Sequence, residues 1–135
     1  IASSRSFIIQ DKSRQVNLEI APTTYRIIES TFLIHTNHYL HKDFISEDKL
    51  NIFSKNSSIK RLNILKAGLT ENSGLNDIKL ILQDHSIYPV GICAHNEGNI
   101  NINETVASVI MYPETQHFYA LKGKPCQNNY NLYTL

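Results

Sequence analysis

The sequence predicts an α+β fold with mainly antiparallel sheets. Strand-like runs fill residues 6–37, helical periodicity governs residues 57–85, and strand-like runs return after residue 90. Strands that follow one another, instead of alternating with helices, pair with their sequence neighbours and so run antiparallel. No repeat and no internal boundary interrupts this order, so we expect residues 1–135 to form a single domain or part of one.

The first strands are expected at "SFIIQD" (6–11) and "QVNLEI" (15–20), two β-rich runs joined by a short polar turn. A second pair, "YRIIES" (25–30) and "TFLIHTN" (31–37), follows the break at Pro22. Apolar and polar residues alternate in the second run, which is typical of a half-buried strand. The apolar set is Val16, Leu18 and Ile20.

The middle of the chain is predicted to be helical. In "SSIKRLNILKAGL" (57–69) apolar residues recur every three or four positions, and Ser57 or Ser58 suits the N-cap. "ENSGLNDIKLILQDH" (71–85) repeats that spacing, and its helix is expected to start near Ser73 or Asn76.

The last third returns to strands. They are expected at "VGICAH" (90–95), "TVASVIMY" (105–112), "HFYALKG" (117–123) and "YNLYTL" (130–135). A polar loop separates the first from the second, and the turn "PETQ" separates the second from the third.

Composition excludes several classes of protein. The formal net charge is +1, which supports no field-based attraction to nucleic acid or an anionic membrane. No apolar run reaches the length of about 18 residues that a membrane span needs. Two cysteines make no disulfide framework, and nothing argues for secretion, so we expect a cytoplasmic protein.

"HTNHYL" (35–40) is the densest polar cluster, and His41 follows it. A metal site at His35, His38 and His41 is the first hypothesis, but on a strand residues 35 and 38 face opposite ways. Cys93 and His95 could form a nucleophilic pair, although "VGICAH" has the character of a core strand and a buried cysteine behaves as a small hydrophobe. We therefore expect no metal and no cofactor.

Three segments in order resemble the penicillin acyltransferase-like family of N-terminal nucleophile hydrolases. "LIHTNHYL" resembles the family's "HTNH" signature, and "ILQDHSIYPVGICAH" resembles its "DH…P…IC…H" segment. "TVASVIMYPETQHFYALKGKPCQNNYNLYTL" resembles its C-terminal segment. The resemblance also includes "SSRSFIIQDKSRQVNLEIAP" before the signature, so it covers nearly the whole chain.

The resemblance implies a four-layer αββα sandwich from a self-cleaving precursor. In that family an N-terminal cysteine attacks a small-molecule acyl or amide substrate, and an amine or water resolves the acyl-cysteine, giving acyl transfer or hydrolysis. It further implies that Asn37 donates its amide to the developing oxyanion, while His35, Thr36 and His38 shape the substrate pocket. A strand-end turn residue that satisfies its own backbone is the alternative for Asn37.

The sequence departs from the family pattern at its first residue, because Ile1 cannot serve as the nucleophile. Cys126 matches the family's "PC", a structural position, and Ala94 stands where members often carry a basic residue. We therefore expect this chain to be the C-terminal part of such an enzyme, a fragment or a processed subunit, with the remaining N-terminal part of the precursor as its partner. The alternative is a non-catalytic remnant that binds a ligand.

Overall fold

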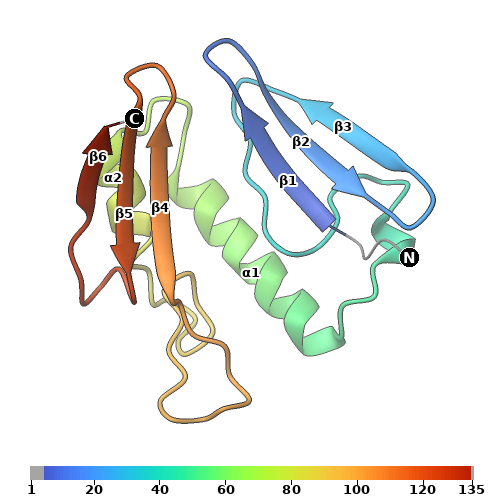
Figure 1. The fold of residues 1–135 in the computed structure, drawn as a ribbon. Helices are drawn as coiled ribbons and strands as arrows, with labels where there is room; N and C mark the ends of the chain where they lie inside the picture. The colour runs from blue at the N-terminus through green and yellow to red at the C-terminus, as the bar shows by residue number, and fades with distance from the viewer. Residues whose placement is uncertain (1–4, 135) are drawn as a thin grey trace. The chain divides into compact units, whose positions relative to one another are not determined.

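The computed structural model describes residues 5–134, which form two compact units (Figure 1). The first unit ends at Lys66 and the second begins at Ala67. Each unit contains one three-stranded antiparallel sheet, which confirms the predicted α+β class. The division into domains and the four-layer sandwich stay predictions.

The sheet of the first unit has the order β1-β2-β3. Its strands are β1 (Arg5–Gln10), β2 (Gln15–Ile20) and β3 (Tyr25–Glu29), so three of the four predicted strands are confirmed. Asp11 forms the first hairpin, because its carboxylate accepts hydrogen bonds from the backbone N–H groups of Ser13 and Arg14 at 2.7 and 2.8 Å.

The fourth predicted strand, at residues 31–37, is wrong: this segment has no regular secondary structure. The Ser58 side chain of α1 accepts the Asn37 N–H, and the Gln15 side chain of β2 donates to the Thr31 carbonyl. Beyond it lie the 3₁₀ turn η1 (Ile45–Glu47) and a core of Ala21, Tyr39 and Phe44, whose two rings are 5.3 Å apart.

Helix α1 (Ile52–Gly68) begins earlier than the sequence predicts. Asn51 is its N-cap, because its side-chain oxygen accepts a hydrogen bond from the Ser54 N–H at 2.9 Å. The prediction of Ser57 or Ser58 as N-cap is therefore wrong, and Ser58 lies fully buried inside the helix.

The alternation in β2 is present, but its polar side is the buried one. Asn17 and Glu19 are 2% and 0% exposed, whereas Val16, Leu18 and Ile20 are only half-buried. A buried carboxylate is tolerated only where donors surround it, and Glu19 has them. The buried polar pair shows that β2 packs against a polar segment, the one that contains the "HTNH" motif.

The second unit contains α2 (Leu75–Ile81) and the sheet β4-β5-β6. The strands are β4 (Ala107–Tyr112), β5 (His117–Lys122) and β6 (Asn131–Thr134), as predicted; Leu135 lies outside the described residues. Gly74 is the N-cap of α2, and its N–H donates to the Asp77 carboxylate at 2.8 Å. The predicted strand at residues 90–95 is wrong, because residues 83–106 contain no helix or strand.

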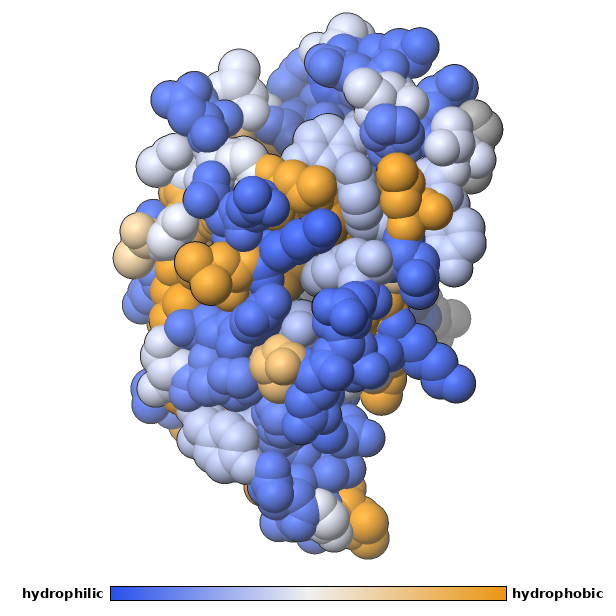
Figure 2. All heavy atoms as spheres, turned by 90° about the vertical axis from the view of Figure 1, so that its left-hand side faces the viewer, coloured by the Kyte–Doolittle hydropathy of each residue, from blue (hydrophilic) through white to orange (hydrophobic). Residues whose placement is uncertain are grey.

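Many apolar strand residues stand open to solvent. Figure 2 shows one face of the molecule, on which orange hydrophobic residues lie between blue hydrophilic ones. Phe7, Ile8 and Ile9 are consecutive in β1 and 46%, 48% and 52% exposed, so neither face of this strand is fully covered among the described residues. No helix in the part of the chain that the structure describes is long and apolar enough to cross a membrane.

Candidate active site

Asn37 lies at a pocket of the first unit with a volume of about 520 Å³. Thr36, Asn37 and Tyr39 contribute one wall. The rest of the lining comes from the start of β1 (residues 5–7) and from residues 48–50, before α1. The Asn37 residue is exposed although its neighbours His38 and Tyr39 are buried, so the chain presents it to solvent.

Ser58 of α1 fixes the backbone on which Asn37 stands. Its hydroxyl oxygen accepts hydrogen bonds from the N–H groups of Asn37 and His38 at 2.8 and 3.1 Å. The hydroxyl of Thr36 donates to the Ser58 carbonyl at 3.1 Å. These three contacts hold residues 36–38 against α1 without any strand pairing, which explains why the segment is ordered but irregular.

Arg61, one turn further along α1, orients the Asn37 amide. Its Nη2 donates to the Asn37 side-chain oxygen at 2.7 Å. A guanidinium has donors only, so the amide must present its oxygen to Arg61 and its NH₂ group elsewhere. That NH₂ group makes no hydrogen bond within residues 5–134, and burial lowers the pKa of Arg61 from its ordinary value.

Glu19 holds the far end of the segment. Its two carboxylate oxygens accept hydrogen bonds from the N–H groups of Leu40 and His41 at 2.7 and 3.0 Å. His35 Nε2 lies 2.9 Å from the same carboxylate, and His35 Nδ1 lies 3.1 Å from the Ser6 hydroxyl. Burial alone would raise the pKa of Glu19, but these hydrogen bonds outweigh it and lower the pKa overall.

The two histidines of the motif and His41 have different partners. His38 Nδ1 lies 2.8 Å from the Ser58 hydroxyl, and burial lowers the pKa of His38. His41 Nδ1 lies 3.7 Å from the Asp43 carboxylate oxygen Oδ2. The histidines therefore do not converge as metal ligands, and His35 and His38 are absent from the lining of the pocket that Thr36 and Asn37 reach.

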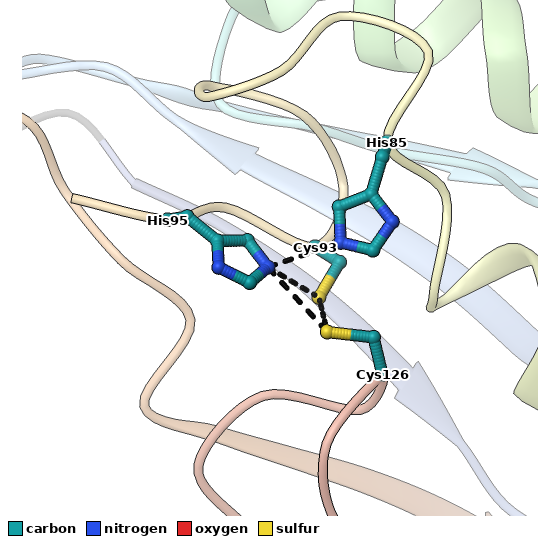
Figure 3. A group of neighbouring side chains, drawn as sticks. All are labelled: His85, Cys93, His95 and Cys126. Carbon is teal, nitrogen blue, oxygen red and sulfur yellow. Dashed lines mark hydrogen bonds between the residues drawn. The ribbon is translucent and has the colours of Figure 1, made fainter. Parts of the chain in front are cut away.

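A second polar cluster lies in the other unit, where His85, Cys93, His95 and Cys126 turn their ligand atoms toward one another (Figure 3). Burial raises the pKa of the Cys93 thiol, and the residue is 0% exposed. A nucleophile needs a thiolate and access to substrate, so this Cys–His pair is not suited to catalysis. The cluster has the donor set of a metal centre.

Sequence reasoning missed the residues that position Asn37, namely Glu19, Ser58 and Arg61. Two signals could have indicated them: a glutamate on an alternating strand and a serine at helical spacing from an arginine. Both patterns are common on solvated surfaces, so neither is specific without the fold.

The family model described as acyl-coenzyme A:6-aminopenicillanic acid acyl-transferase matches residues 1–126. No curated protein matches the chain.

Proposed function

Because the chain belongs to the acyl-coenzyme A:6-aminopenicillanic acid acyl-transferase family, we propose that it supplies the oxyanion donor of an acyl-transfer or amide-hydrolysis site. The nucleophile is a cysteine in a part of the protein outside this sequence. Its thiolate adds to the acyl carbonyl, the leaving thiol or amine departs with a proton, and an amine or water then takes the acyl group from the cysteine.

The orientation of the Asn37 amide carries this proposal. Arg61 holds the amide oxygen at 2.7 Å, so the NH₂ group is the part that can donate to a negative oxygen in the pocket. A donor fixed before the reaction costs no reorganisation when the charge develops, which is the basis of oxyanion stabilisation. Arg61 is thus a positioning residue, and Asn37 is the residue that touches the reacting atoms.

The exposed apolar side chains of the strands favour the view that another part of the protein covers them. Both faces of β1 carry exposed apolar side chains, and β6 exposes Leu132 at 52% and Tyr133 at 52%. Exposed apolar strands are a risk for aggregation and are normally covered. We propose that the N-terminal part of the precursor covers such strands and completes an αββα sandwich after self-cleavage.

The test uses the full-length protein with an acyl-coenzyme A thioester as acyl donor and 6-aminopenicillanic acid or water as acceptor. Asn37→Ala is expected to reduce kcat by about 10²–10³-fold, or about 2.7–4 kcal/mol, the usual loss for one oxyanion donor. Asn37→Asp tests the sign of the charge, because a carboxylate would repel the oxyanion, and it should be no more active than Asn37→Ala.

Arg61→Met separates the orientation of the Asn37 amide from its hydrogen bond to the oxyanion. This variant keeps the Asn37 donor but releases its oxygen, so kcat should fall less than in Asn37→Ala while KM changes little. The exposed Lys60, its neighbour on α1, provides the matched control as Lys60→Met. Full activity of Asn37→Ala would refute the role of Asn37, and ligand binding without turnover in the wild type would favour a non-catalytic remnant.

A further inference from the structure

The second unit brings four metal-ligating side chains together from segments that are far apart in the sequence. His85, Cys93 and His95 come from the irregular segment 83–106, and Cys126 comes from the turn between β5 and β6. Their four ligand atoms all lie within 4.8 Å of one another. Figure 3 shows the two imidazole rings and the two sulfur atoms pointing into one shared space.

Four of the six distances between these atoms are within about 0.3 Å of those in a tetrahedral zinc site. The two Nε2 atoms are 3.0 Å apart and the two Sγ atoms 3.5 Å apart. His95 Nε2 lies 3.4 Å from Cys126 Sγ and 3.7 Å from Cys93 Sγ. Around zinc, with its usual bond lengths, tetrahedral geometry gives about 3.3 Å between nitrogens, about 3.8 Å between sulfurs and about 3.6 Å between the two kinds.

Hydrogen bonding alone leaves this cluster poorly satisfied. His95 Nε2 has three close neighbours, and a single ring nitrogen either donates one proton or accepts one. His95 and Cys93 are 7% and 0% exposed, so water cannot readily share the contacts. An ion bound to all four atoms would satisfy every one of them at once.

The backbone around the ligands is fixed independently of any ion. The Cys93 N–H donates to the Asp84 carbonyl at 3.1 Å, and the His95 N–H donates to the Pro89 carbonyl at 2.8 Å. Ala94 and Thr105 exchange hydrogen bonds of 2.9 and 3.1 Å across the same segment. On the other side, the Gln127 N–H closes a turn onto the Lys124 carbonyl at 3.0 Å and places Cys126.

We propose that His85, Cys93, His95 and Cys126 bind one structural Zn²⁺ ion. Two thiolates and two imidazoles in tetrahedral geometry are a typical zinc donor set. Four protein ligands leave no open position for water or substrate, so the ion is structural and takes no part in acyl transfer. It cross-links segment 83–106, which has no helix or strand of its own, to the connection between β5 and β6.

The test measures bound metal in the full-length protein purified under reducing conditions without added chelator. Elemental analysis should find about one zinc per chain, the stoichiometry of a closed four-ligand site. After removal of zinc, titration with Co²⁺ should produce the visible bands of tetrahedral cobalt and a thiolate-to-metal charge-transfer band that saturate at one equivalent. The Co²⁺ spectrum needs no variant, so it holds even where a substitution prevents folding.

Variants then locate the site. His85→Asn and Cys126→Ser should each lose the zinc and the cobalt spectrum, while His117→Asn, which changes a histidine of β5 outside the cluster, should keep both. Chelation should also lower the Tm of the wild type but leave the Tm of His85→Asn unchanged. A wild type that is folded without metal and gives no cobalt bands overturns the proposal. So does a Cys93–Cys126 disulfide found by mass spectrometry in the native protein, or equal zinc in the cluster variants.

Discussion

Glu19 provides the sharpest test of how the candidate active site is held in place. It is 0% exposed, and its carboxylate accepts hydrogen bonds from Leu40 N–H, His41 N–H and His35. In Glu19→Gln, one oxygen becomes an NH₂ group that meets a backbone N–H instead of accepting from it. Because each hydrogen bond to a charged acceptor contributes about 1.5–3 kcal/mol, we expect this variant to lose about 3 kcal/mol of unfolding free energy at neutral pH.

The pH dependence has a defined sign. The pKa of Glu19 is lowered from its ordinary value of 4.5, so the stability that it contributes is present above that value. It is lost as the pH falls through the lower folded-state pKa. The wild type should therefore lose stability on acidification below about pH 4.5 in part through Glu19, and Glu19→Gln should lack that part.

Urea unfolding followed by far-ultraviolet circular dichroism at several pH values measures both effects. Glu29→Gln is the matched control, because Glu29 lies in the same sheet but its side chain is 53% exposed in an ion pair with Arg14. Exposed ion pairs contribute little, so this control should unfold much like the wild type. An unchanged midpoint for Glu19→Gln, or an acid limb equal to that of the wild type, would refute the role of Glu19.

Two further substitutions test the local geometry. Ser58→Ala leaves the N–H groups of Asn37 and His38 without their acceptor and should cost about 1–3 kcal/mol of unfolding free energy, measured in the same titration. No loss would show that water replaces the hydroxyl. Gly123→Ala should lower the Tm of the protein, because Gly123 has a φ of +91° and an added Cβ would lie 2.9 Å from the Asn128 amide nitrogen. An unchanged Tm would show that Asn128 and the backbone adjust freely.

Sequence periodicity predicted the six strands and two helices of residues 5–134, although in β2 the buried side of the strand is the polar one. It failed at residues 31–37 and 90–95, two runs with the composition of strands. In the first run the hydroxyl of Ser58 accepts the Asn37 N–H and that of Ser30 accepts the Phe32 N–H. In the second run carbonyl and hydroxyl groups of nearby turns accept the backbone N–H groups. A strand pattern cannot reveal that side chains and turns have replaced a pairing partner.

The candidate sites were predictable to different degrees. The "HTNH" motif directed attention to Asn37 through family resemblance, whereas Arg61, which orients it, lies 24 positions away. The cluster of His85, Cys93, His95 and Cys126 was not predicted, since these residues are not spaced in the sequence as a compact ligand motif. Cys126 joins the others only through the turn between β5 and β6, a relation that depends on the fold.

Two buried side chains that hold the backbone of residues 37–41 explain how the exposed Asn37 amide can be oriented before a reaction begins. Ser58 accepts the N–H groups of residues 37 and 38, and Glu19 accepts those of residues 40 and 41. The backbone is thus fixed on both sides of Tyr39. The Asn37 residue stays exposed, and within residues 5–134 its side chain is held by Arg61. Because buried side chains fix this backbone, the segment does not need strand partners along its edges. The Asn37 NH₂ group can therefore face a substrate. A strand at this place would have given the same N–H groups to a neighbouring strand and would have set the direction of Asn37 by the pleat.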